Sequence, residues 1–149
     1  MEGPFKFWKV QDKRRLLLAM MEELARDAHI SFEGDFRGLR LLNTPDASQE
    51  ETPALKRATV WPKQDFVVLP LEPSMSETIV SALGGTVPSA IIHIQIENNA
   101  LRQFAAYDNF HPQCIFFGTG VKEAFLESLV SQSIMRPYTE RPPPPLRAI

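Results

Sequence analysis

The fold of this chain is decided by residues 89–118, which read SAIIHIQIENNALRQFAAYDNFHPQCIFFG. Isoleucine and polar side chains alternate at the start of this stretch, and the apolar positions are Ile92, Ile94 and Ile96. Alternation of this kind is typical of a β-strand that buries one face. Asn98-Asn99 tolerates positive φ, so we predict a hairpin turn there and a second strand after it. Residues 113–117 follow as a third strand.

The predicted turn also sets the register of the hairpin. It places Ile96 opposite Leu101, Ile94 opposite Gln103 and Ile92 opposite Ala105. One face of the strand pair is then mostly apolar, as a half-buried antiparallel pair requires.

Two longer helices and one short helix are predicted outside this segment. Apolar residues repeat at helical spacing over 12–28 and again over 121–130. Ser74 and Glu77 form a capping-box pattern that begins the short helix. Gly84-Gly85 supplies the left-handed residue that ends it.

Further strands come from short β-branched and aromatic runs. Gly34-Asp35 predicts a tight hairpin between strands at 30–33 and 36–42. Pro70 cannot donate to a ladder, so the strand predicted at 66–71 ends there or lies at an edge. The other predicted strands are 1–10, 58–61 and 134–138.

Together these elements predict an α+β fold. Its mainly antiparallel sheet would have about five to seven strands, with the two longer helices and the short helix packed on it. We predict one globular domain over residues 1–140, because a chain of 149 residues can bury a core without a disulfide or a metal. Residues 141–149 contain RPPPPLR and predict a polyproline II tail, which is either a stiff extension or a ligand for an aromatic groove.

Charge and cysteine content narrow the class of protein. The net charge is −2 and Cys114 is the only cysteine, which fits a reducing compartment. No apolar run approaches the ~20 residues of a membrane span. We therefore expect a soluble, cytoplasmic protein without a membrane partner.

The N-terminal segment carries the case for nucleic-acid binding. Basic and aromatic residues gather there: Phe5, Lys6, Phe7, Trp8, Lys9, Lys13, Arg14 and Arg15. Such a mixture can stack on bases and neutralise phosphates. In the alternative arrangement, the rings pack under the first helix while the cations face water. The negative charge of the whole chain does not favour a nucleic-acid partner.

One cluster has the residue types of a nucleophilic enzyme. Asp108, His111 and Cys114 are spaced three apart, so a turn would bring a base and an orienting acid close to a thiol. In the alternative, Cys114 packs as a small hydrophobe within its strand. The second reading is the one we expect, because no known nucleophile motif surrounds the cysteine.

No metal or cofactor is expected. The histidines are far apart in the sequence, at His29, His93 and His111, and no Cys-x-x-Cys pair exists. Residues 118–120, Gly-Thr-Gly, precede a helix but lack the Lys-Ser or Lys-Thr of a phosphate loop.

Two surfaces are predicted to bind a partner protein. The first is the elbow after the second hairpin strand, with Tyr107, Asp108, Asn109, Phe110 and His111. The second is the polar loop at 43–53, with the acidic residues Asp46, Glu50 and Glu51. Aromatic anchors beside charge are typical of binding hot spots, and acidic charge speeds encounter with a basic partner. We therefore expect a non-enzymatic protein-binding module, in its most specific form an immunity-type protein that neutralises a toxic effector.

Overall fold

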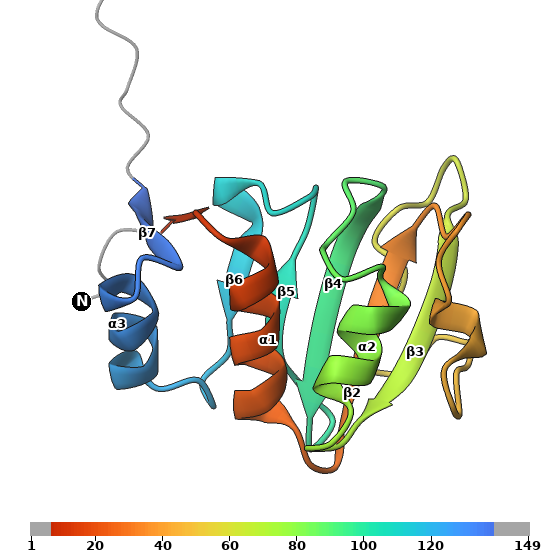
Figure 1. Cartoon of the computed structure of the whole chain (residues 1–149), viewed down its shortest axis with the longest axis horizontal. Helices are drawn as coiled ribbons and strands as arrows, with labels where there is room; N and C mark the ends of the chain where they lie inside the picture. The colour runs from red at the N-terminus through yellow and green to blue at the C-terminus, as the bar shows by residue number, and fades with distance from the viewer. Residues whose placement is uncertain (1–6, 139–149) are drawn as a thin grey trace, which may run out of the picture.

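The structure is a computed structural model that describes residues 7–138. The predicted α+β class is confirmed, because these residues form a five-stranded and a two-stranded antiparallel sheet together with three α-helices (Figure 1). The predicted tail at 141–149 lies outside the described residues. None of the helices described is long and apolar enough to cross a membrane.

The elements follow one another in the order β1, α1, β2, β3, α2, β4, β5, β6, α3, β7. The strands are β1 (Phe7–Val10), β2 (Ala28–Gly34), β3 (Asp65–Leu71), β4 (Ile91–Asn98), β5 (Leu101–Ala106), β6 (Ile115–Phe117) and β7 (Met135–Tyr138). The α-helices are α1 (Lys13–Leu24), α2 (Ser76–Ala82) and α3 (Glu123–Ser131). Two short 3-10 turns are η1 (Leu41–Asn43) and η2 (Pro112–Cys114).

Helices cover one face of the five-stranded sheet. The strand order is β3-β2-β4-β5-β6, and α1 and α2 lie side by side over this face (Figure 1). Met21 from α1, Phe32 from β2 and Ile94 from β4 are buried in the core between these layers. At the β6 end, Trp8 of β1 packs edge-on against Phe117, with ring centroids 6.0 Å apart. The periodic apolar residues of α1 and the alternating isoleucines of β4 are therefore buried in the same core.

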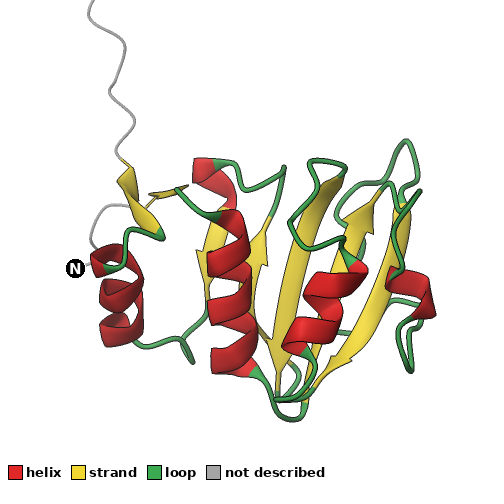
Figure 2. Ribbon diagram, in the orientation of Figure 1, coloured by secondary structure: helices red, strands yellow, loops and turns green. Residues whose placement is uncertain are grey.

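The opposite face of the sheet is polar at its centre. Four buried polar residues alternate there with the core residues of β2 and β4: Ser31, Glu33, Gln95 and Glu97. The connection from β2 to β3 is irregular apart from η1 (Figure 2). Its residues 56–59 bond to Glu33 and Gln95 on this face. Within this connection, Leu55 packs with Phe66 and Val68 of β3 in a second, small core.

The β4–β5 hairpin confirms the predicted burial of Ile94 and Ile96 and corrects the predicted register. Ile96 pairs with Phe104 and Ile94 pairs with Ala106, with an irregularity after Ile96. The two turn residues are Asn99 and Ala100, which have φ values of 54° and 64°.

Tertiary contacts explain the shifted turn. The side-chain amide of Asn98 donates to the carbonyls of Leu24 and Arg26 at 2.8 and 3.2 Å, which fastens this end of β4 to the end of α1. The Glu97 carboxylate accepts the N–H of Ala100 at 2.8 Å. Asn98 therefore remains in the strand and the turn moves one residue along the chain.

Helix α1 is shorter than the predicted 12–28. Asp12 caps its start by accepting the N–H of Arg15 at 3.0 Å. Arg26 and Asp27 have φ values of 94° and 52°, so the chain reverses there and Ala28 begins β2. The apolar stripe predicted for the helix thus ends in a strand that packs on the same core.

The strand predicted at 36–42 and the hairpin at Gly34-Asp35 are wrong. Strand β2 pairs with β3 on one side and with β4 on the other, so it has no free edge for residues 36–42. Gly34 is needed for a different reason: a Cβ there would overlap the Ala90 carbonyl oxygen. The edge position of β3 agrees with the prediction from Pro70.

Three smaller predictions are also corrected. Residues 58–61 form no strand, because the N–H groups of Ala58 and Thr59 bind the Glu33 carboxylate. Met75 precedes α2 without a side-chain cap, in place of the capping box. Strand β6 begins at Ile115 because η2 occupies the preceding residues.

Candidate functional site

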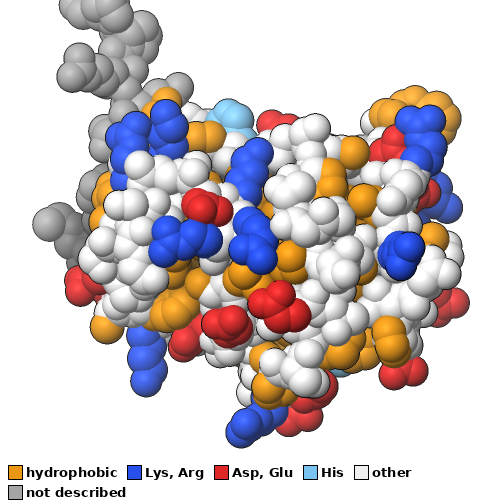
Figure 3. Space-filling view, viewed as in Figure 1, with side chains coloured by type: hydrophobic (Ala, Val, Ile, Leu, Met, Phe, Trp, Pro, Cys, Tyr) orange, Lys and Arg blue, Asp and Glu red, His pale blue; other side chains and the backbone are white. Residues whose placement is uncertain are grey.

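The connection before β3 presents the most exposed large apolar side chains in residues 7–138. Val60 and Trp61 are 93% and 84% exposed. They lie in residues 56–64, which we name the 56–64 loop and which projects at the upper right of Figure 1. Hydrophobic and basic side chains meet at this corner of the surface (Figure 3). Adjacent exposed apolar residues with a polar surround are typical of a binding surface.

Side chains of the polar sheet face fasten the start of this loop. Glu33 of β2 accepts the N–H groups of Ala58 and Thr59 at 2.7 and 3.1 Å. Gln95 of β4 donates its amide to the Lys56 carbonyl at 2.8 Å. Both anchoring side chains are buried, and a low local dielectric strengthens the hydrogen bonds that they make. The loop is therefore fastened to the rigid centre of the sheet.

Contacts within the connection fix the rest of the loop. Glu51 accepts the backbone N–H of Arg57 at 2.8 Å. The Arg57 guanidinium donates from Nη1 to the Gln64 carbonyl at 2.5 Å and lies over the Phe66 ring, 5.0 Å from its centroid. The Gln64 side chain donates to the Pro62 carbonyl at 3.0 Å. Val60 and Trp61 are consequently held outward from a loop that is bonded on both sides of them.

His93 of β4 links the 56–64 loop to the elbow. Its Nδ1 accepts the backbone N–H of Asp108 at 3.2 Å, and its Nε2 lies 2.7 Å from the Thr59 hydroxyl oxygen. A backbone N–H can only donate, so Nδ1 must carry the free lone pair and Nε2 must carry the hydrogen. Nε2 therefore donates to Thr59, and the two segments are joined through one imidazole.

This tautomer decides what His93 and Thr59 can do chemically. A hydroxyl nucleophile needs a base that accepts its proton. Here the ring nitrogen facing Thr59 is the donor, and the ring nitrogen that can accept is engaged by Asp108. In this arrangement His93 and Thr59 thus form a structural link. The hydrogen bond between them runs from His93 to the hydroxyl oxygen, which is the reverse of the direction that activates a hydroxyl nucleophile.

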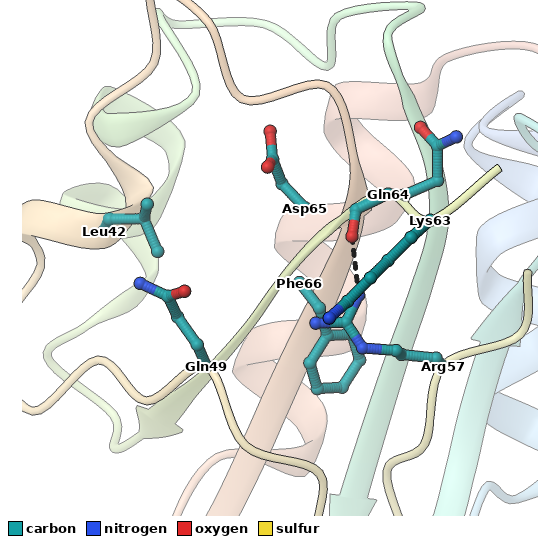
Figure 4. Close-up of a pocket in the computed structure, with 7 residues that line it drawn as sticks. All are labelled: Leu42, Gln49, Arg57, Lys63, Gln64, Asp65 and Phe66. Carbon is teal, nitrogen blue, oxygen red and sulfur yellow. Dashed lines mark hydrogen bonds between the residues drawn. The ribbon is translucent and has the colours of Figure 1, made fainter.

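A hollow of about 220 Å³ opens beside the loop (Figure 4). It is lined by Leu42, Gln49, Arg57, Lys63, Gln64, Asp65 and Phe66. Figure 4 shows the Arg57 and Lys63 side chains running toward the same end of the hollow, with Leu42 and Gln49 on the other wall. The Asp65 carboxylate accepts the N–H of Phe36 at 2.9 Å.

The elbow residues predicted to bind a partner differ in their exposure. Asp108 and His111 are exposed, and Tyr107 and Asn109 are half-buried. Phe110 is only 5% exposed and belongs to the main core. The Phe110 ring is therefore not exposed in this conformation, while its predicted role as a contact residue stays a prediction.

The elbow backbone is left-handed over three residues in a row. Asp108, Asn109 and Phe110 have φ values of 51°, 53° and 60°, and the His111 N–H closes the turn by donating to the Tyr107 carbonyl at 3.2 Å. Left-handed non-glycine residues are strained, so surrounding contacts must hold them. Lys13 does so by donating to the Asn109 side chain at 3.0 Å.

Tyr107 faces the polar side of the sheet. Its hydroxyl donates to the Gln95 side-chain oxygen at 3.2 Å, and its ring meets His93 edge-on at 5.5 Å. Burial raises the pKa of Tyr107, while the nearby Arg102 cation acts in the opposite direction. Through Gln95, this residue too is connected to the anchors of the 56–64 loop.

The three acidic residues predicted at 43–53 are exposed. Glu51 is bonded to the Arg57 backbone, so it acts as a loop anchor. Asp46 has a φ of 60° and Glu50 is fixed by an N–H bond to the Ser48 hydroxyl at 3.2 Å.

Asp108, His111 and Cys114 do not assemble as a nucleophile, base and acid. His111 uses Nδ1 to accept the N–H of Gln113 at 3.1 Å. In the described part of the chain, the Asp108 carboxylate has no hydrogen bond to His111. Cys114 is half-buried at the end of η2, so it is neither in a strand nor fully within the core.

Several residues in the described part of the basic N-terminal segment are engaged in internal contacts. Trp8 is buried, so it offers no ring face for a base to stack on. Arg14 donates to the Gly85 carbonyl at 3.1 Å and Arg15 to the Gln132 carbonyl at 3.2 Å. Phe5 and Lys6 lie outside the described residues.

The comparisons with known proteins returned no match to a family model, to a curated protein or to a solved structure. Across residues 7–138, no three His, Cys, Asp or Glu side chains gather in a group that could hold a metal ion. The residues that sequence reasoning missed are Val60 and Trp61. Their only sequence signal is Pro62, which cannot donate to a ladder and therefore stops a strand from continuing past Trp61.

Proposed function

We propose that this protein is a non-enzymatic protein-binding module that uses Val60 and Trp61 as its central contact. The observation that carries the proposal is a tryptophan 84% exposed on a loop that is bonded to Glu33 of the sheet before it and to Arg57 after it. Tryptophan is enriched among the residues that dominate binding energy. A contact residue already held in place loses little conformational freedom on binding, and this increases affinity.

In its narrower form, the proposal describes an immunity-type protein that acts in the cytoplasm by neutralising a toxic effector. A small module that works by occupying a surface needs a fixed contact element and no reactive group of its own. The 56–64 loop supplies such an element, and the exposed residue Asp108 is connected to it through His93.

The test is quantitative affinity capture from a native lysate of the source cell, with matched variants. Trp61→Ala removes the proposed anchor, and Leu101→Ala removes another exposed apolar side chain, 62% exposed on β5. A partner of the proposed kind is recovered with wild type and Leu101→Ala and is lost with Trp61→Ala. Truncation of a hot-spot residue costs about 2 kcal/mol or more, which is roughly a 30-fold loss of affinity.

Equal recovery by all three proteins would contradict the proposed contact. For the immunity role, the recovered partner is expressed in cells with and without this protein. We expect wild type to relieve the growth defect that the partner causes and Trp61→Ala to relieve it less. A partner that does not impair growth would remove the narrower role and leave the binding role intact.

A further inference from the structure

The hollow beside Trp61 has the size and lining of a site for one charged group. Its volume of about 220 Å³ equals the space of about seven water molecules in the liquid. Arg57 and Lys63 line it together, and Phe66 forms part of its wall. Lys63 is two residues from Trp61, so the hollow and the proposed contact belong to the same loop.

Arg57 is held ready for a ligand. One of its guanidinium nitrogens is committed to the Gln64 carbonyl, and the group lies over Phe66. The guanidinium carries five N–H donors, so further donors stay available in a fixed plane. Fixing the plane matters because arginine recognises carboxylates and phosphates through donors in a rigid fork.

In the part of the chain that the structure describes, the cations of the hollow have no carboxylate partner of their own. Within residues 7–138, neither Arg57 nor Lys63 forms an ion pair. Glu51 binds the Arg57 backbone and Asp65 binds the Phe36 backbone. In Figure 4, the Asp65 side chain points away from the Arg57 guanidinium. Two like charges in one partly enclosed space repel each other, and a bound anion relieves that repulsion.

We propose that this hollow binds a carboxylate from an acidic segment of the partner protein, next to the surface that Trp61 contacts. This inference rests on the proposed function and specifies the chemistry of the partner. It replaces the expectation of a basic partner, which came from Asp46, Glu50 and Glu51. Glu51 is engaged inside the connection, whereas Arg57 and Lys63 are the two cations that line the hollow. The one carboxylate in its lining, Asp65, is bonded to the Phe36 N–H.

The probe is a hexapeptide of glutamate with blocked ends, titrated into the protein labelled with ¹⁵N. We expect saturable shifts of the Arg57 Nε–H and of the backbone amides of residues 57–61 and 63–66, with millimolar affinity that falls as salt increases. Blocked hexaglutamine is the neutral control and should give no such shifts. Equal shifts with hexaglutamine would overturn the proposal, because the charge would then be irrelevant.

Matched charge variants place the binding in the hollow. Lys63→Gln should weaken the glutamate peptide by about threefold and Arg57→Gln by about tenfold, since the second group is partly buried and makes directed hydrogen bonds. Lys122→Gln removes the same charge from the start of α3, outside the hollow, and should leave affinity unchanged. If Lys122→Gln weakens binding as much as Lys63→Gln, diffuse attraction replaces a site and the proposal fails.

Two further experiments distinguish a carboxylate site from a phosphate site and separate this inference from the proposed function. Inorganic phosphate is titrated in parallel, and tighter binding of phosphate with no binding of the peptide would overturn the carboxylate assignment. Partner capture is repeated with Lys63→Gln. Loss of capture with Trp61→Ala, with no effect of Lys63→Gln on peptide or partner, overturns only this inference. Peptide binding in the hollow with no effect of Trp61→Ala on capture overturns only the proposed function.

Discussion

The 56–64 loop and the elbow at 107–111 are both bonded to the His93 imidazole, but they differ in backbone conformation and in the exposure of their aromatic side chain. In the elbow, three residues adopt positive φ and the ring of Phe110 is buried at 5% exposure. In the 56–64 loop no residue has positive φ, and Trp61 stands out at 84% exposure. The elbow thus combines a strained backbone with a buried Phe110 ring, whereas the loop combines an unstrained backbone with an exposed Trp61 ring. Of the two segments, the loop is therefore the one that leaves a large aromatic ring open to solvent.

Truncating the Phe110 and Trp61 rings, one at a time, gives the largest expected difference in stability between the two regions. Phe110→Ala should destabilise the protein by about 3–5 kcal/mol, because it empties a packed core position. Trp61→Ala should change stability by less than about 0.5 kcal/mol, because its ring is surrounded by solvent. Urea unfolding followed by circular dichroism measures both. A loss of stability with Trp61→Ala as large as with Phe110→Ala would show that the loop packs its tryptophan.

The anchoring of the loop is tested at Glu33. Glu33→Gln keeps the shape of the side chain but turns one of its two acceptor oxygens into an N–H₂ donor facing a backbone N–H. We expect a loss of about 1–3 kcal/mol, the cost of an unsatisfied buried group. Hydrogen exchange should accelerate at the amides of Ala58 and Thr59 more than elsewhere.

Glu50→Gln is the matched control for this substitution. It makes the same chemical change on an exposed side chain and should leave stability within about 0.5 kcal/mol of wild type. If exchange at Ala58 and Thr59 is unchanged in Glu33→Gln, the carboxylate is not what holds the loop.

Local patterns of sequence predicted the parts of this fold that depend on local spacing. Alternation places Ile94 and Ile96 in the core because a strand has a period of two, whatever it pairs with. Register was missed because it depends on distant groups, here the Leu24 carbonyl that binds Asn98. The sequence around Thr59 and Trp61 favours a strand, and only the Glu33 carboxylate, 26 residues before Thr59, takes the N–H groups that a ladder would need.

The candidate site was predicted less well than the fold for the same reason. Phe110 and Trp61 are both aromatic residues in polar turns, so composition alone does not separate the buried ring from the exposed one. Their difference comes from what lies beside them in space. Lys13 and α1 cover the elbow, whereas the described elements leave Trp61 open.

The link between the two regions is tested at His93. His93→Leu removes both ring nitrogens and should cost about 1–2 kcal/mol, since two hydrogen bonds with modest net value are lost. In the wild-type protein, ¹⁵N shifts of the imidazole should show hydrogen on Nε2 and none on Nδ1 at neutral pH. Hydrogen on Nδ1 would contradict the bond from Asp108 and separate the elbow from the loop.

The smallest effect is expected from Tyr107, which borders both regions through Gln95 and His93. Burial raises the pKa of its hydroxyl above the ordinary value of about 10, so folding favours the protonated phenol. This contribution is complete below about pH 10 and is lost as pH rises through the raised pKa. The stability of wild type should therefore fall in that range more steeply than that of Tyr107→Phe, while at pH 7 the two should differ by less than about 1 kcal/mol. Absorbance of tyrosinate, with Tyr107→Phe to isolate the signal of Tyr138, measures the titration directly. A Tyr107 that ionises at the ordinary pKa would show that this side of the sheet is open to water, which would weaken the argument that a low local dielectric strengthens the bonds of the 56–64 loop anchors.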